Sequence, residues 1–158
     1  MKRTLILLLV CMLSLSGCGG KEMVTFYYCQ ADYVYNNTES IIAGESRDIS
    51  SHSNDLNFLI SLYLMGPAEK GFVSAFPADV KLLSLKNQEN ALYIELSQIS
   101  NFSEAEYVLA CACMAMTCME LTDVNSVTIT SDGRSVTIDE SNLTLYDTGI
   151  PTETSVGG

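Results

Sequence analysis

Four cysteines are the residues of this chain best suited to chemistry, because a thiolate can ligate a metal and two thiols can form a disulfide. Cys111, Cys113 and Cys118 lie close together, and Cys29 lies far upstream. On a helix Cys111 and Cys118 share a face, whereas Cys113 is about 200° round from Cys111 at 3.6 residues per turn. Structural zinc sites favour cysteine pairs that are separated by two to four residues and converge from turns. The spacing is therefore poor for a metal site.

These four cysteines could be either free, buried thiols or partly disulfide-bonded. Free cysteine is among the most buried residue types, which favours a core-filling role for all four. In an oxidising compartment the chain could instead form one disulfide, and Cys29 could then approach the helix that carries the other three. The sequence alone does not decide whether Cys29, Cys111, Cys113 and Cys118 are thiols or partly disulfide-bonded.

The remaining polar residues show no catalytic or metal-binding pattern. His52 is the single histidine of 158 residues, and its serine neighbours favour a solvated loop position over a role as ligand or base. No nucleophile–base pair accompanies it, and the scattered acidic residues form no calcium-binding motif. A net charge of −11 opposes nucleic-acid binding. We therefore predict a chain that is not an enzyme, holds no cofactor or metal and binds no nucleic acid.

The first residues have the pattern of an export signal. Met1-Lys2-Arg3 is positively charged, and an uncharged apolar run over residues 5–13 follows it. That run is too short to span a bilayer but has the length of a secretory signal's apolar region. It ends at Leu15-Ser16-Gly17-Cys18, which resembles a bacterial lipobox. The alternative is an ordinary signal in which Cys18 is incidental.

The lipobox resemblance implies a lipid anchor on Cys18. Cleavage would remove residues 1–17 as a signal peptide, and the Cys18 thiol would carry the lipid. Residues 18–23 would then be a short tether that holds the domain close to the membrane, since Gly19 to Met23 reach at most about 18 Å. The expected location is the extracytoplasmic face of the cell membrane.

Hydrophobic periodicity predicts two helices. Apolar residues recur at helical spacing between residues 54 and 65, and Gly66 followed by Pro67 ends that helix. Ser103 and Glu106 form a capping box, which begins a second helix that runs to about Leu121.

Alternating apolar residues predict the strands. Residues 36–53 are polar and read as a loop, with at most one more short strand around Ile41 and Ile42. Asp132-Gly133 forms the turn of a C-terminal hairpin. The other strands are expected at residues 24–29, 80–85, 91–96, 124–130 and 134–138.

The order of these elements is β-α-β-β-α-β-β, which predicts an α+β fold. We expect a two-layer sandwich in which one mixed or antiparallel sheet carries both helices on one face. The domain should span residues 24–145, and residues 146–158 should form a disordered tail because they are rich in Thr, Gly, Pro, Glu and Ser.

This order, with these residues, resembles the GerM-type domain (GerMN) of sporulation and germination lipoproteins. The resemblance covers about residues 24–138 and implies a non-enzymatic domain outside the cytoplasmic membrane. The segments that carry it are Leu56–Ile60, Gly66-Pro67, Ser74–Pro77, Val80–Leu85, Leu96-Ser97, the helix after Ser103 and the turn Ser131–Gly133.

The second helix is apolar nearly all round, which indicates burial on more than one side. Cys111, Met114 and Cys118 can face a sheet, whereas Leu109, Cys113 and Met116 lie on a different side. That second side is either covered by the first helix or forms a surface for self-association or for another protein.

We expect a membrane-anchored, extracytoplasmic lipoprotein. Its domain would act in protein interaction and assembly, within a sporulation- or germination-related envelope complex and with envelope proteins or a second copy as partner. The first alternative is a lipoprotein that binds a ligand or glycan without turnover, which needs a concave apolar pocket. The second is a cell-wall hydrolase, for which no pair of carboxylates or metal motif is evident.

Overall fold

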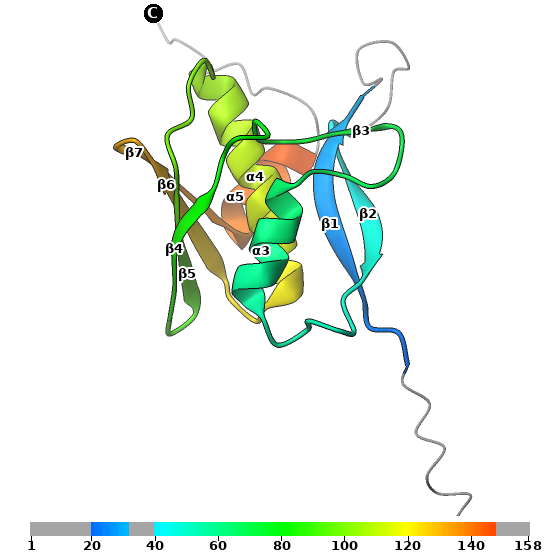
Figure 1. Ribbon diagram of the computed structural model, residues 1–158. Coiled ribbons are helices and arrows are strands. Elements are labelled where there is room, and N and C mark those ends of the chain that lie inside the picture. The colour runs from blue at the N-terminus through cyan, green and yellow to red at the C-terminus, as the bar shows by residue number, and fades with distance from the viewer. Residues whose placement is uncertain (1–19, 32–39, 148–158) are drawn as a thin grey trace, which may run out of the picture.

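Two β-sheets with helices between them form the part of the chain that a computed structural model describes, residues 20–31 and 40–147 (Figure 1). This arrangement confirms the predicted α+β class. The elements in chain order are β1 (Met23–Gln30), β2 (Ile42–Asp48), α3 (Leu56–Leu64), β3 (Phe72–Val73), β4 (Leu82–Gln88), β5 (Ala91–Leu96), α4 (Glu104–Leu121), β6 (Ser126–Ser131), β7 (Arg134–Asp139) and α5 (Glu140–Asp147).

The strands are divided between a three-stranded and a four-stranded sheet, and not joined in the one sheet that was expected. The small sheet has the order β2-β1-β3 and is antiparallel throughout. The large sheet has the order β4-β5-β6-β7, in which β5 and β6 are parallel and α4 is the crossover between them. A parallel pair requires such a long connection, so the position of α4 on this sheet follows from the strand order.

Strand β2 is longer and more regular than its polar sequence suggested. It pairs with β1 from Met23 opposite Asp48 to Cys29 opposite Ile42. Gly44 is required there, because a Cβ atom at this position would collide with the Thr25 side chain across the ladder. The segment lacks the usual apolar alternation because its buried central residue is Glu45, a charged residue that is rarely placed in a core.

Glu45 and Arg47 hold the loop after α3 against β2. The buried Glu45 carboxylate accepts hydrogen bonds from Arg47 Nη2 at 3.0 Å and from the backbone N–H groups of Ala68 and Glu69 at 3.0 and 3.1 Å. Arg47 Nη2 also donates to the Gly66 carbonyl at 2.7 Å. We call these groups the Glu45–Arg47 clasp, which gives the Ala68 and Glu69 amides of the exposed loop a fixed acceptor.

Helix α5 was not predicted from the sequence. Asp139 caps its first turn, since the Asp139 carboxylate accepts from the Ser141 and Asn142 N–H groups at 2.9 and 3.1 Å. The helix continues through Asp147, past the expected domain end at residue 145. The rest of the predicted disordered tail lies outside the described residues.

Helix α4 lies between the two sheets and forms the centre of the core. Its contacts extend to β1 on one side and to β6 and β7 on the other. Thr117 joins it to β1, because the Thr117 hydroxyl accepts from the Tyr27 N–H at 2.8 Å and donates to the Cys113 carbonyl at 3.0 Å. The predicted burial of this helix on more than one side is therefore confirmed. Its buried residues are Tyr107, Ala110–Ala115, Thr117 and Cys118.

The predicted capping box at the start of α4 is present. The Ser103 hydroxyl accepts from the Glu106 N–H at 3.3 Å, and the Glu106 carboxylate accepts from the Ser103 hydroxyl and N–H at 2.7 and 2.8 Å. These hydrogen bonds lower the pKa of the Glu106 carboxyl, with the hydroxyl contributing most.

We expect Ser103→Ala to reduce the free energy of unfolding by about 1 kcal/mol at pH 7. Because the pKa of Glu106 is depressed in the folded state, its stabilisation is present near neutral pH and is lost as pH falls through that folded pKa. The free energies of unfolding of the wild type and Ser103→Ala, measured by urea titration, should therefore differ less at pH 3 than at pH 7. Ser100→Ala removes an exposed hydroxyl just ahead of the helix and is the control. An equal loss in both variants would contradict the capping role.

Candidate functional site

The four cysteines in the described residues are all free thiols, as the core-filling interpretation requires. Cys111, Cys113 and Cys118 are buried, and Cys29 is half-buried. Burial raises the pKa of the Cys111 thiol to about 12 and also raises that of Cys118, so both are neutral near pH 7. The structure brings only Cys29 and Cys113 together, with 3.8 Å between their sulfur atoms.

His52 is exposed on the surface. Its imidazole stacks on the Phe58 ring, with 3.9 Å between the ring centroids. Over the described ranges, 20–31 and 40–147, His, Cys, Asp and Glu side chains form no group of three or more that could hold a metal ion.

The second side of α4 is covered from within the chain. Cys113 is fully buried, and Leu109 and Met116 are half-buried and pack against the core. The cover comes mainly from β1, whereas α3, the element expected there, makes few contacts with α4. Cys113 is thus inaccessible to a partner in this fold.

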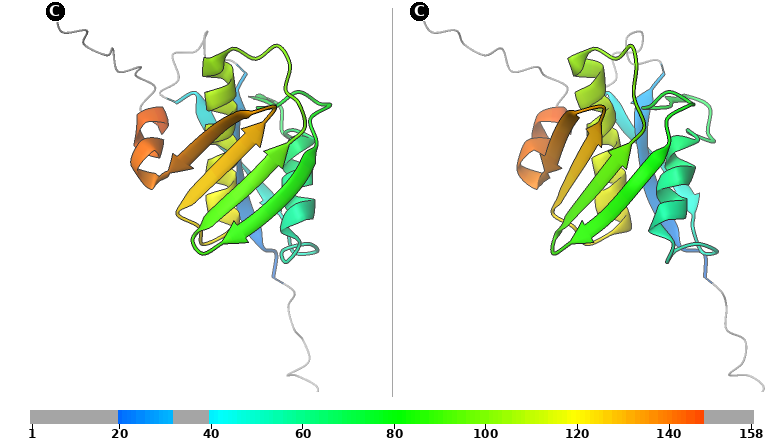
Figure 2. Two further views of the ribbon diagram at one scale, coloured as in Figure 1. Left: turned by 90° about the vertical axis from the view of Figure 1, so that its left-hand side faces the viewer. Right: turned by 60° about the vertical axis from the view of Figure 1, so that its left-hand side comes forward.

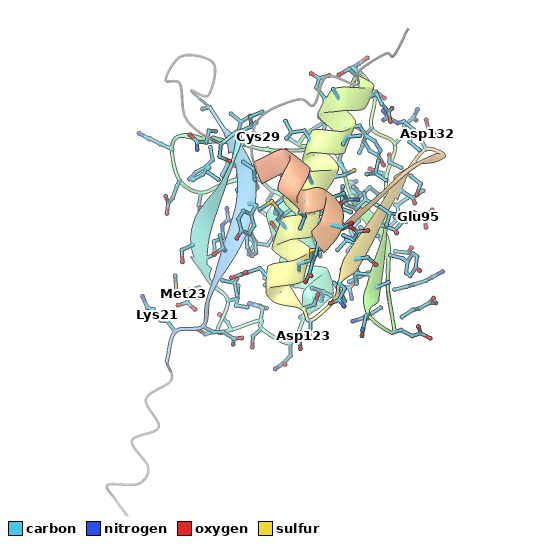
Figure 3. The ribbon with its side chains drawn as sticks, turned by 180° about the vertical axis from the view of Figure 1, so that it is seen from behind. Lys21, Met23, Cys29, Glu95, Asp123 and Asp132 are labelled. Atoms are coloured by element: carbon cyan, nitrogen blue, oxygen red, sulfur yellow. The ribbon has the colours of Figure 1, made fainter. Side chains whose placement is uncertain are left out.

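Cys18, the expected site of lipid attachment, lies outside the described residues. The described chain begins near Lys21 and Met23, which lie together at one end of the molecule, whereas Cys29 and Asp132 lie at the opposite end (Figure 3). Among the described helices, none has the length and apolar character needed to cross a membrane.

No described helix covers the outer face of the four-stranded sheet. All described helices lie behind this sheet or at its β7 edge (Figure 2). Cross-strand pairing arranges its outward side chains in rows, which place similar polar groups side by side. One row is Lys86, Tyr93, Thr128 and Thr137, and the next is Ser84, Glu95, Thr130 and Ser135.

Hydrogen bonds hold these rows in a fixed arrangement. Thr128 and Thr137 hydroxyls lie 2.9 Å apart, and Thr130 and Ser135 hydroxyls lie 3.2 Å apart. At the other side of the sheet the Ser84 hydroxyl donates to Glu95 at 3.0 Å. The side chains are thus oriented before any partner binds, which lowers the entropic cost of binding.

Tyr93 is the aromatic centre of this outer face. It is 43% exposed on the inner strand β5, and two open hollows adjoin it. One, of about 560 Å³, lies toward the β4–β5 turn and is lined by Gln88–Ala91, Tyr93, Asn125 and Ser126. The other, of about 240 Å³, is lined by Ser84, Lys86, Tyr93, Ile94, Glu95 and Thr130. An exposed tyrosine between two open hollows is a suitable anchor for a binding partner.

The alternation of residues in β5 indicated part of this outer face. In β5 the residues Leu92, Ile94 and Leu96 alternate with Tyr93 and Glu95, and the structure buries the first set and exposes the second. The strand pattern thus predicts that Tyr93 points outward. It does not predict that the neighbouring strands leave that side uncovered, since this depends on where the helices pack.

Comparison with protein families identifies the class of the protein. The family model Germane, described as sporulation and spore germination, matches residues 25–137. The chain therefore belongs to the Germane family, and the resemblance to a GerM-type domain is confirmed.

Solved structures share the fold at low sequence identity. The first GerMN domain of the sporulation protein GerM from Bacillus subtilis matches with a TM-score of 0.56 and 13% identity, over 73% of this chain and 86% of that one. The tandem GerMN domains of the same protein match with a TM-score of 0.51 and 21% identity, over 76% of this chain and 42% of that one.

A candidate lipoprotein from Clostridium perfringens matches with a TM-score of 0.47 and 19% identity, over 78% of this chain and 90% of that one. A search of curated proteins finds no match.

Proposed function

We propose that this sporulation-family protein is a lipid-anchored, extracytoplasmic lipoprotein whose domain binds an envelope protein without catalysing a reaction. The partner docks on the outer face of the β4–β7 sheet and belongs to a sporulation- or germination-related assembly. The observation that carries the proposal is that this face is ordered, polar and uncovered, with Tyr93 at its centre.

The composition of the face favours a protein partner. Tyrosine is enriched among the residues that dominate binding energy at protein interfaces, and such residues are surrounded by polar groups that exclude water. Leu83, 60% exposed on the edge strand β4, adds apolar area to the same sheet. Both hollows beside Tyr93 are open to solvent, unlike the concave pocket typical of small-molecule sites.

The short tether supports the proposed orientation. Lys21 and Met23 lie at one end of the molecule, whereas Glu95 of the outer face lies along its side (Figure 3). A lipid on Cys18 would hold that end within about 18 Å of the membrane. The outer face would then remain open to a partner beside the protein.

The test is in vivo cross-linking of the full chain, followed by capture from membranes and mass spectrometry. We expect the wild type to recover an envelope protein and Tyr93→Ala to recover about 30-fold less, which corresponds to losing an anchor worth about 2 kcal/mol. Phe58→Ala is the matched control, because Phe58 is similarly exposed, at 40%, but lies on α3. Cys18→Ser should abolish retention on the membrane.

Equal recovery of the partner by the wild type and Tyr93→Ala would refute the docking face. Membrane retention of Cys18→Ser at the wild-type level would refute the lipid anchor. Recovery of a bound glycan or small molecule, lost in Tyr93→Ala, would instead support the ligand-binding alternative.

A further inference from the structure

Cys29 and Cys113 form a pair of thiols in contact that the proposed docking face does not use. Their sulfur atoms are 3.8 Å apart, although 84 positions separate them in sequence. Cys29 ends the regular pairing of β1 with β2, and Cys113 lies in the middle of α4. A disulfide requires an S–S distance of about 2.05 Å, so the two sulfur atoms would have to move about 1.8 Å closer together.

We propose that Cys29 and Cys113 are a disulfide-forming site, oxidised by thiol–disulfide exchange with an extracytoplasmic disulfide donor. The donor is either a small-molecule disulfide or the disulfide form of an oxidoreductase, and the same exchange chemistry applies to both. The extracytoplasmic setting rests on the proposed function, whereas the chemistry rests on the two sulfur positions alone.

The order of the two steps follows from burial. Cys29 is half-buried, whereas Cys113 is fully buried, so Cys29 is the thiol that an external disulfide can reach. The hydrogen bond with Cys113 also lowers the pKa of Cys29 and raises that of Cys113, which favours Cys29 as the thiolate.

The exchange balances as follows. The Cys29 thiolate attacks one donor sulfur, the donor S–S bond breaks, and a mixed disulfide forms with release of the first donor thiolate. The Cys113 thiol gives its proton to a released thiolate and attacks Cys29 Sγ, which expels the second donor thiolate. Cys29 releases its own proton to solvent when it becomes the thiolate, and the other donor thiolate takes up a proton from solvent. Two electrons thus pass from the two protein thiols to the donor, which leaves as two thiols.

The other two cysteines are poor competitors. Cys111 and Cys118 are fully buried, and burial keeps both as neutral thiols. Neither has a sulfur contact with Cys29 among the interactions of the described residues. The disulfide should therefore be specific for Cys113.

The test is oxidation of the purified full chain with oxidised glutathione, followed by quenching in acid, blocking of free thiols and trypsin digestion. Trypsin cuts after Lys21, Arg47, Lys86 and Arg134, so Cys29 lies in peptide 22–47 and the three helix cysteines share peptide 87–134. We expect these two peptides to become linked by a bond that dithiothreitol breaks. The link should be absent in Cys29→Ser and Cys113→Ala but present in Cys111→Ala and Cys118→Ala.

Oxidation should also raise the Tm of the wild type by on the order of 10 °C, because the bond closes a long loop in the unfolded chain. The Tm of Cys29→Ser should not rise, and since Cys29 is only half-buried this variant remains informative if Cys113→Ala does not fold. Glutathione retained on Cys29 without the link between the peptides would overturn the proposal. A link that persists in Cys113→Ala would also overturn it. Neither result depends on the Tyr93 face.

Discussion

Glu45→Ala should reduce the free energy of unfolding by about 3–5 kcal/mol, because it removes one partner of a buried ion pair. Arg47 would keep its charge with little access to water, since its side chain is only 12% exposed. The Ala68 and Glu69 N–H groups would also lose their acceptor. Native domains are stable by about 5–15 kcal/mol, so this loss would be a large part of the total. Urea denaturation followed by circular dichroism measures it.

Two further variants test whether the loss of stability comes from the Glu45–Arg47 clasp or from the removal of any negative charge. Glu69→Ala removes an exposed carboxylate from the same loop and should change stability by less than about 0.5 kcal/mol. Glu45→Leu combined with Arg47→Met removes both charges and should recover much of the loss, since a buried ion pair is often replaceable by apolar side chains. A loss below about 1 kcal/mol in Glu45→Ala would contradict the clasp.

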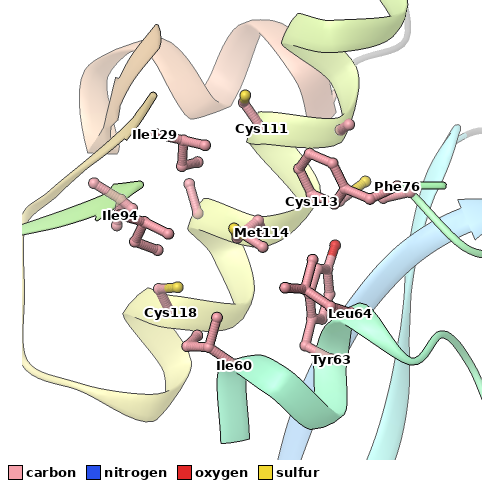
Figure 4. Close-up of a cluster of buried hydrophobic side chains, with 14 of the residues drawn as sticks. Ile60, Tyr63, Leu64, Phe76, Ile94, Cys111, Cys113, Met114, Cys118 and Ile129 are labelled. Carbon is pink, nitrogen blue, oxygen red and sulfur yellow. The ribbon is translucent and has the colours of Figure 1, made fainter. Parts of the chain in front are cut away.

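Met114→Ala should be comparably destabilising, at about 3 kcal/mol within the usual range of 2–5 for deleting a buried Met side chain. Met114 is fully buried, and Figure 4 shows it among Ile94 and Ile129 of the large sheet and Tyr63 of α3. Its truncation leaves a cavity between the large sheet and α3, and these closely packed elements cannot move to fill it. Thermal and urea denaturation of the purified chain measure the loss.

Met65→Ala is the matched control, because Met65 is 83% exposed at the end of α3 and should change stability by less than about 0.5 kcal/mol. Met114→Leu keeps the volume and should cost less than about 1.5 kcal/mol. If Met114→Ala proved as stable as Met65→Ala, α4 would not be the centre of the core.

The local features of the fold could be predicted from the sequence. The capping box at Ser103, the stop at Gly66 and the alternation of β5 all depend on near neighbours, and the structure contains each of them. Only a short strand around Ile41 and Ile42 was expected where β2 lies, because the burial of β2 depends on an ion pair and not on apolar residues. The division into two sheets was missed because alternation reveals that a strand has a buried face but not which strand lies beside it.

For the candidate site, too, the sequence predicted which way side chains face but not which elements pack beside them. The sequence placed Leu109, Cys113 and Met116 together on one side of α4, but the strand that covers this side lies more than 80 positions away in the chain. Conversely, Tyr93 was predicted to point outward, yet only the packing of all helices behind the sheet makes its face available. The approach of Cys29 to the helix was anticipated as a possibility, and only tertiary structure selects Cys113 from the three candidates.

The pairing of β1 with β2 has a mechanical consequence. β1 is the first strand after the N-terminal segment, and seven of its residues face β2 in an unbroken register. The hydrogen bonds of an antiparallel ladder are perpendicular to the strands. A force applied ahead of Met23 and directed along β1 would therefore load all of the β1–β2 hydrogen bonds in shear at the same time. The contact of Thr117 with the opposite edge of β1 would bear part of the same load. Strand β1 is thus placed to resist extraction when the domain is pulled by its N-terminus.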